Sequence, residues 1–181
     1  MNASEETVLV DFNDPEAARQ AITDNASELA AVILEPMMGG GGCIPADAEF
    51  LGVLREETQK QGAFLIFDEV MTSRLAPGGM QERTGVIPDL AAFGKYLGGG
   101  VSFGAFGGRN DLMSRLDPRD PEPLVHSGTF NNNVLTMAAG CAGLEKVLTP
   151  EATIKLNDAG DRLRERMQQA ADNRGVAAQV M

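Results

Sequence analysis

The sequence predicts an α/β fold built on a mostly parallel central sheet. Two short apolar runs, 30–34 and 63–67, have the length and the β-branched or aromatic content of buried strands. Residues 45–62 between them carry apolar side chains at helical spacing, with charges on the opposite side. A strand, a helix of crossover length and a second strand form the βαβ pattern, which joins parallel strands. Ligands of such sheets bind at the carboxyl ends of the strands, so the residues that follow each strand are the first candidates for a site.

The beginning of the chain carries a helix with clear boundaries, followed by the first strand. Asp14 is a good N-cap residue and Pro15 suits the first helical position, so a helix begins there and ends near Asn25. Residues 30–34 are apolar without interruption, which predicts a strand that is buried on both faces. Four consecutive glycines, 39–42, follow it and allow the backbone to turn sharply.

Polar residues follow the next two strands at their carboxyl ends. The strand 63–67 leads directly into Asp68 and Glu69, and a later apolar run, 90–93, leads through a glycine to Lys95. An acidic side chain and a lysine are therefore expected near the same edge of the sheet.

The second half of the chain is predicted to be irregular at first and then helical. Residues 102–108 form a short glycine-rich strand, and residues 117–123 form a loop rich in proline and charge. Helices are expected over 134–148, where small residues permit close packing, and over 149–175. Residues 176–181 have the composition of a strand that begins as the chain ends.

Composition and charge exclude several classes of function. Fifteen basic and 26 acidic residues give a net charge of −11 at pH 7, so the chain lacks the basic stripe that nucleic-acid binding requires. No apolar run approaches the roughly 18 residues of a membrane span, and no signal segment opens the chain. Cys43 and Cys141 lie far apart without metal-ligand spacing, which indicates a reducing, cytoplasmic setting.

Familiar phosphate-binding and hydrolytic motifs are missing. Lys95 follows a glycine but precedes Tyr96, whereas a P-loop requires Ser or Thr there. A dinucleotide-binding GxGxxG fails when it is counted from Gly39 or from Gly98. His126 is the single histidine and no GxSxG segment accompanies it, so Ser/His/Asp hydrolysis is disfavoured and a structural role for the histidine is preferred.

Asp68 and Lys95 together fit the chemistry of pyridoxal 5′-phosphate (PLP). In PLP enzymes a lysine forms a Schiff base with the cofactor, and a carboxylate pairs with the pyridinium nitrogen. The protonated ring accepts the electron pair that remains when a Cα–H bond of the substrate breaks, and the freed lysine amine moves the proton. On spacing alone the alternatives stay open, because an acid at the end of a strand is commonly a helix cap or a salt-bridge partner.

Six short segments support the PLP interpretation, because their order and spacing resemble those of one protein family. They are EPMMG from residue 35, FDEVMT from 67, PDL from 88, FGKYLGGG from 93, GAFGGR from 104 and SGTFNNN from 127. Over residues 30–145 the chain resembles the class III aminotransferases, and within them the branch similar to glutamate-1-semialdehyde aminomutase. The resemblance implies a fold-type I PLP-dependent transferase, a three-layer α/β fold around a mostly parallel sheet.

The same resemblance implies roles for four residues. Lys95 is the catalytic Schiff-base lysine, Asp68 is the partner of the pyridinium nitrogen, and Val70 packs on the face of the cofactor ring. Thr129 binds the cofactor phosphate at a site in the other subunit of a homodimer, and a threonine beside a helix N-terminus suits an anion. Simpler alternatives remain: a helix cap for Thr129, a core position for Val70 and a structural role for Glu35.

The resemblance also implies a domain organisation. Residues 1–175 are expected to form part of a PLP-binding large domain, and residues 176–181 to begin a truncated C-terminal small domain. Members of the family carry an upstream phosphate-binding loop and a stacking aromatic residue that this sequence does not contain. The chain is therefore expected to be a fragment of the large domain.

Two functions follow from these observations. The first is PLP-dependent transamination, in which Lys95 serves the transfer of an amino group between an amine or amino acid and a keto or aldehyde acceptor. The second is a catalytically incomplete aminotransferase fragment that retains only part of the PLP site and the dimer surface. A nucleotide-binding switch protein is a weaker third, because it rests only on the acidic pair after strand 63–67. Transfer between two molecules and rearrangement within one both stay open.

Overall fold

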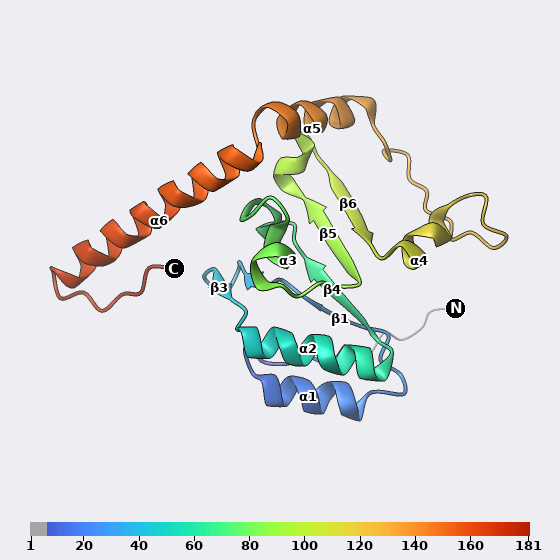
Figure 1. Cartoon of the computed structure of the whole chain (residues 1–181), viewed down its shortest axis with the longest axis horizontal. Helices are drawn as coiled ribbons and strands as arrows, with labels where there is room; N and C mark the ends of the chain where they lie inside the picture. Colours follow the sequence, from blue (N-terminus) through green and yellow to red (C-terminus); the bar gives the residue numbers. More distant parts are fainter. Residues whose placement is uncertain (1–6) are drawn as a thin grey trace.

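The chain folds around a four-stranded sheet, with α1 and α2 packed together against it and α6 extending away (Figure 1). The structure is a computed structural model that describes residues 7–181, so the first six residues of the predicted 1–175 segment lie outside the described residues. The helices and strands are α1 Pro15–Asp24, β1 Ala31–Leu34, β2 Met37–Met38, β3 Ile44–Pro45, α2 Ala48–Gln61, β4 Phe64–Asp68, α3 Gly79–Thr84, β5 Leu90–Gly94, β6 Gly104–Gly108, α4 Asn110–Met113, α5 Val134–Lys146 and α6 Pro150–Asp172. Short 3₁₀ turns are η1 Thr72–Arg74, η2 Lys95–Gly98 and η3 Ser114–Leu116.

The central sheet has the strand order β1-β4-β5-β6. β1 pairs with β4 and β4 pairs with β5 in parallel, while β6 runs antiparallel to β5. α2 is the crossover helix between β1 and β4. The prediction of an α/β fold with a mostly parallel sheet is therefore confirmed, and the antiparallel strand lies at one edge.

The two N-terminal helices begin and end where local signals place them. Asp14 caps α1, because its side chain accepts a hydrogen bond from the Ala17 N–H at 2.9 Å. Gly62 ends α2 in the left-handed conformation, with φ of 71°, which glycine adopts without a steric penalty. The predicted boundaries of both helices are confirmed to within a few residues.

One face of the sheet forms the hydrophobic core with α1 and α2. Alternate residues of β4 and β5 point toward these helices, as the two-residue period of a strand requires. The buried members of this core are Ala18, Ile22, Phe50, Leu51, Leu54, Leu65, Phe67 and Ala91. Each large apolar side chain that is buried in this way stabilises the fold by about 1.5–3 kcal/mol.

The opposite face of the sheet is only partly covered. Ile33 of β1 is 65% exposed and Phe106 of β6 is 44% exposed. The prediction that strand 30–34 is buried on both faces is therefore wrong, because β1 is an edge strand and the described residues place no helix over this face. Asp68 shares this face, since Leu65 and Phe67 point the other way into the core. Residues 7–181 thus form two of the three layers that the fold implies.

A buried charge cluster fixes the end of the sheet opposite to Asp68. The Asp89 side chain accepts a hydrogen bond from the Leu65 N–H at 2.8 Å and pairs with Arg55 and Arg109, each at 2.9 Å. Burial raises the pKa of the Asp89 carboxyl, but the Leu65 hydrogen bond and the two guanidinium groups outweigh it and lower this pKa below its usual value. The cluster joins β4, β5 and the end of β6.

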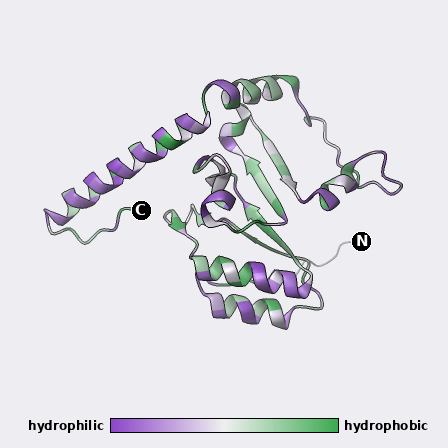
Figure 2. Cartoon of the chain, viewed as in Figure 1, coloured by the Kyte–Doolittle hydropathy of each residue, from purple (hydrophilic) through white to green (hydrophobic). Residues whose placement is uncertain are grey.

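The C-terminal part of the chain extends away from the sheet. α6 is largely hydrophilic, with isolated apolar side chains along it (Figure 2). Residues 176–181 form no strand, contrary to the prediction, because no strand of the described residues lies beside them. The Gln168 side chain instead donates to the Ala178 carbonyl and accepts from the Val180 N–H, both at 2.9 Å. No helix in this part of the chain, or elsewhere in residues 7–181, is long and apolar enough to cross a membrane.

Two small elements were not predicted from the sequence. β2 and β3 form an antiparallel hairpin around the four glycines 39–42. α3 lies within the segment that follows β4, for which the sequence indicated no helix. Both elements border the carboxyl ends of the parallel strands.

Candidate active site

Asp68 is the last residue of β4 and lies opposite Ala92 of β5. Its carboxylate Oδ1 accepts a hydrogen bond from the Val70 N–H at 3.0 Å. This bond orients the half-buried side chain at the end of the strand. Oδ2 accepts no hydrogen bond from another of the described residues, so one oxygen is free to receive a proton donor from a ligand.

Lys95 lies just past the end of β5, three residues after the position that pairs with Asp68. Because β4 and β5 are parallel neighbours, the two residues lie at the same edge of the sheet, as predicted. Lys95 has a left-handed backbone, with φ of 54°, which is uncommon for a residue with a side chain. Its side chain is exposed and makes no hydrogen bond or ion pair with other residues in the range 7–181.

Val70 lies against the backbone that leads into Lys95. A Cβ atom placed on Gly94 would lie 3.4 Å from Val70 Cγ1 and 3.2 Å from the Phe103 carbonyl oxygen. A glycine at this position therefore allows close packing between the segments that follow β4 and β5. The structure thus brings Asp68, Val70 and Lys95 together at one edge of the sheet.

Glu69 is a structural residue of the site that sequence reasoning missed. It is fully buried, and its carboxyl oxygens accept from Thr72 Oγ1 at 3.0 Å, the Met80 N–H at 2.8 Å, the Gln81 N–H at 3.3 Å and Gln81 Nε2 at 3.2 Å. Gly79 leaves room for this arrangement, because a Cβ there would lie 2.7 Å from the carboxyl group. Glu69 therefore fastens α3 and the preceding turn to the end of β4.

The turn η2, which starts at Lys95, packs directly on α5. A Cβ atom on Gly99 would collide with the Ala139 carbonyl, and one on Gly140 would collide with the Leu97 carbonyl oxygen. The small residues of α5 therefore permit the close packing that the sequence predicted for this helix, and the partner is the lysine segment.

The structure does not bring Thr129 to Asp68, Val70 or Lys95. Thr129 is exposed in a turn before α5, and it makes no hydrogen bond to those three residues. It is also not the cap of α5, because Asn133 Oδ1 accepts the Leu135 and Thr136 N–H groups at 3.1 and 3.2 Å. Thr129 therefore faces outward from this chain.

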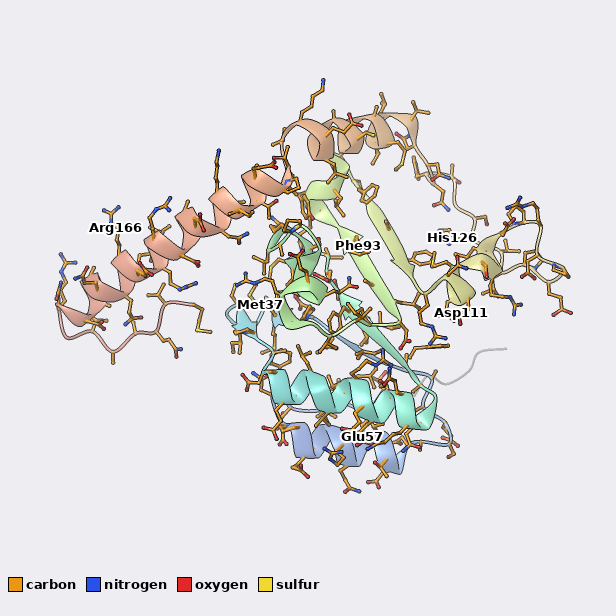
Figure 3. The ribbon with its side chains drawn as sticks, in the orientation of Figure 1. Met37, Glu57, Phe93, Asp111, His126 and Arg166 are labelled. Atoms are coloured by element: carbon orange, nitrogen blue, oxygen red, sulfur yellow. The ribbon has the colours of Figure 1, made fainter. Side chains whose placement is uncertain are left out.

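Two other candidates have structural roles. Glu35 Oε2 accepts a hydrogen bond from the Gly39 N–H at 3.3 Å, so it supports the hairpin that Met37 begins (Figure 3). His126, also labelled in Figure 3, packs edge-on against Phe106 with ring centroids 5.3 Å apart. Within residues 7–181, no group of three or more His, Cys, Asp and Glu could hold a metal ion.

Comparison with known proteins identifies the family of this chain. The family model described as "Aminotransferase class-III" matches residues 3–181, nearly the whole chain. The chain belongs to the class III aminotransferases. This confirms the resemblance that the six sequence segments carried, and the fold is that of the fold-type I PLP-dependent enzymes.

Individual relatives agree with the family. A β-phenylalanine transaminase from Variovorax paradoxus is 54% identical over 172 residues, which are 95% of this chain and 39% of the relative. A glutamate-1-semialdehyde 2,1-aminomutase from Sorangium cellulosum (strain So ce56) is 43% identical over 175 residues, which are 96% of this chain and 39% of the relative. A solved structure of a transaminase with PLP bound has a TM-score of 0.90 and 35% identity, and the match covers 96% of this chain and 41% of that one.

This class III aminotransferase chain spans about two fifths of the length of the relatives it matches. The expectation of a fragment is therefore supported. Members of the family depend on PLP, which confirms the predicted cofactor class.

The residues at the sheet edge fit PLP. Asp68 has one carboxylate oxygen free for a protonated ring nitrogen, and Lys95 has an amine that no other described residue engages. Val70 supplies an apolar surface beside the lysine segment. These three groups match the base, the carboxylate and the packing residue that PLP chemistry requires.

Proposed function

We propose that this chain is the lysine-bearing part of a PLP-dependent aminotransferase, which transfers an amino group between an amine or amino acid and a keto or aldehyde acceptor. Lys95 is its catalytic residue, and Asp68, Val70, Lys95 and Thr129 bind the cofactor. One observation carries the proposal: β4 ends in Asp68, and Lys95 directly follows the parallel neighbour β5, three positions beyond the residue that pairs with Asp68. That arrangement supports a cofactor that must contact a carboxylate and an amine at once.

The side chains have distinct tasks in this proposal. PLP, when bound, supplies an aldehyde for amino groups and a conjugated ring that takes up an electron pair. Asp68 holds a proton on the ring nitrogen through its free oxygen, and its Val70 hydrogen bond keeps it aimed. Lys95 Nζ would move the proton between the substrate Cα and the carbon of the cofactor aldehyde. Val70 excludes water from one side of the site.

We further propose that the enzyme is a homodimer. The segment around Thr129 exposes large apolar side chains, which supports an interface there. They are Leu124, Val125, Phe130, Val134 and Leu135, each more than half exposed. Thr129 then reaches a cofactor phosphate in the partner subunit. This agrees with the absence of any hydrogen bond between Thr129 and the other three site residues within residues 7–181.

Substrate and setting follow as narrower proposals. The name of the Variovorax relative makes a β-amino acid the first amino donor to test. The name of the aminomutase relative makes an amino aldehyde the second. The two exposed, free cysteines fit a reducing cytoplasm. We assign residues 1–175 to the PLP-binding large domain and residues 176–181 to the beginning of a small domain.

A catalytically incomplete fragment is the second candidate function. It is favoured by the short share of the relatives that the chain spans and by the sheet face that the described residues leave open around Ile33 and Phe106. Such a fragment keeps Lys95 and part of the cofactor site without turnover.

Selective trapping on lysine tests the proposed cofactor site. The chain has four lysines, so PLP followed by borohydride reduction and mass spectrometry compares Lys95 directly with Lys60, Lys146 and Lys155. We expect the label on Lys95 at PLP concentrations that leave the other three unmodified. Lys95→Ala should abolish the absorbance band of lysine-bound PLP, with Lys146→Ala as the matched control. A band that survives Lys95→Ala would contradict the assignment.

Turnover distinguishes the two candidate functions. The chain is incubated with PLP, β-phenylalanine and 2-oxoglutarate, and glutamate formation is followed. Turnover that requires Lys95 supports the enzyme, whereas selective Lys95 labelling without turnover supports the incomplete fragment.

A further inference from the structure

Tyr96, the single tyrosine of the chain, ties the lysine segment to the turn that follows Asp68. Its hydroxyl group donates a hydrogen bond to Ser73 Oγ at 3.0 Å. The guanidinium carbon of Arg74 lies 4.9 Å from the centroid of the Tyr96 ring, within the range of a cation–π contact. Two consecutive residues of η1 therefore hold the residue next to Lys95.

The turn that receives Tyr96 is itself fixed. The Ser73 N–H donates to the Glu69 carbonyl at 3.0 Å, and Arg74 Nε donates to the Met71 carbonyl at 3.0 Å. Glu69 in turn is buried and held by α3. Tyr96 is thus connected to a rigid part of the site, and the connection runs from the end of β4 to the start of η2.

Lys95 needs such a restraint because its backbone is strained. A left-handed conformation costs a residue with a side chain stability relative to glycine, and such residues persist only where the surroundings hold them. The Lys95 side chain itself makes no hydrogen bond or ion pair to other described residues. The Lys95 backbone consequently sets the direction in which the side chain leaves Cα, and this backbone is held only through its neighbours.

The opposite side of η2 supplies a second restraint of a different kind. The contact of Gly99 and Gly140 with facing backbone keeps η2 against α5. This contact does not involve the Tyr96 side chain, which binds η1 instead.

We propose that Tyr96 is a positioning residue, which holds Lys95 in its left-handed conformation by binding Ser73 and Arg74 and so fixes the approach of Nζ to the cofactor. The proposal rests on the proposed role of Lys95 as the cofactor lysine. The cost of the left-handed conformation sets the size of the expected effect. Loss of the restraint should reduce the fraction of molecules with a left-handed Lys95 by roughly 5- to 30-fold.

The first test uses the chain without PLP. If Lys95 is held left-handed, Lys95→Gly should fold more stably than Lys95→Ala, by roughly 5- to 30-fold in the unfolding equilibrium constant measured in urea. In the Tyr96→Phe background this advantage of glycine should shrink severalfold, because the backbone is no longer held. An equal advantage in both backgrounds would overturn the proposal, whatever PLP does.

The second test follows the amine. Trapping of PLP on Lys95 should need roughly 5- to 30-fold more PLP in Tyr96→Phe, while trapping on Lys146 stays unchanged. Ser73→Ala removes the same hydrogen bond from the other partner and should reproduce the effect. Thr84→Ala is the matched control, because it removes a hydroxyl group that binds only within the α3 region, to the Met80 carbonyl and the Val86 N–H.

The outcomes separate the two proposals. Selective trapping on wild-type Lys95 that Tyr96→Phe leaves unchanged would overturn the positioning role and keep the proposed function. Absence of selective trapping on wild-type Lys95 would instead contradict the proposed function. A loss in Thr84→Ala equal to that in Tyr96→Phe would show a general effect of stability and overturn the positioning role.

Discussion

Replacement of Glu69 by alanine should destabilise the chain strongly, although Glu69 has no proposed catalytic role. Its carboxyl group accepts four hydrogen bonds, and the two short ones come from the buried Thr72 hydroxyl and the Met80 N–H. A buried donor left without an acceptor costs about 1–3 kcal/mol, so two such donors cost about 4 kcal/mol. The two longer bonds from Gln81, at 3.3 and 3.2 Å, are only partly buried and add less.

Thermal unfolding measures this effect. For a chain of this length each kcal/mol shifts Tm by about 2–4 °C, so Glu69→Ala should lower Tm by about 8–16 °C. Glu69→Gln keeps one acceptor oxygen, which can retain the two short bonds, and should cost about half as much. Glu28→Ala is the matched control, since Glu28 is exposed and makes no side-chain hydrogen bond with other residues in 7–181. A Glu69→Ala shift no larger than that of Glu28→Ala would refute the reasoning.

Three further predictions concern the sheet, α5 and the outward-facing threonine. Because the folded-state pKa of Asp89 lies below its unfolded value of about 3.9, its contribution to stability is complete well above pH 4 and is lost as the pH falls through the folded pKa. Asp89→Asn should therefore cost about 3 kcal/mol at pH 7 and flatten the acid limb of urea-monitored stability below about pH 5. Gly140→Ala should destabilise by about 1–3 kcal/mol and weaken PLP trapping, whereas Gly143→Ala, whose Cβ would lie 3.7 Å from its nearest neighbour, should be neutral or stabilising in thermal unfolding. Asn133→Ala should cost about 1 kcal/mol, because it removes the cap of α5. Thr129→Val should leave Tm unchanged and weaken only PLP binding, as measured by fluorescence titration. A loss of Tm in Thr129→Val would instead indicate that Thr129 caps the helix.

Helix boundaries in this chain are predictable because their determinants are local. Asp14 binds an N–H three residues away, and Gly62 ends α2 through its own backbone freedom. By contrast, α3 depends on Glu69, which lies ten residues before the helix begins. No local pattern in six residues that begin with glycine indicates such a partner, so the sequence alone does not indicate this helix.

Exposure is predictable only where the covering element is known. The apolar content of strand 30–34 indicated burial on both faces, yet Ile33 is 65% exposed because the described residues place nothing over it. The strand predicted over 176–181 fails for the same reason, since apolar composition cannot form a ladder without a neighbouring strand. An apolar side chain indicates a residue that is suited to burial, but its actual burial depends on elements that lie far away in the sequence.

The candidate site was predictable to the extent that its chemistry is carried by residue type. An acid and a lysine at adjacent strand ends fit one cofactor, and the structure places them at the carboxyl ends of the neighbouring parallel strands β4 and β5. Glu69 was interpreted as half of an acidic pair, because sequence does not show that it is fully buried while Asp68 is not. Adjacent carboxylates on a strand point to opposite sides, so one of the pair faces the site and the other supports it.

The geometry also separates what this chain supplies from what it does not. Asp68 lies on the sheet face that Ile33 and Phe106 leave open, while Lys95 is restrained from two sides by η1 and α5. Residues 7–181 therefore hold the Asp68 carboxylate and the backbone around Lys95, but they do not shield the Asp68 face from water. A ligand held at such an edge makes its covalent and ring-nitrogen contacts but stays hydrated on one side, where electrostatic interactions are weak. We accordingly expect selectivity for Lys95 to survive in the isolated chain while affinity for PLP stays low. We therefore expect PLP to label Lys95 selectively at saturating concentration. We also expect the bound PLP to be lost when the sample is diluted before reduction.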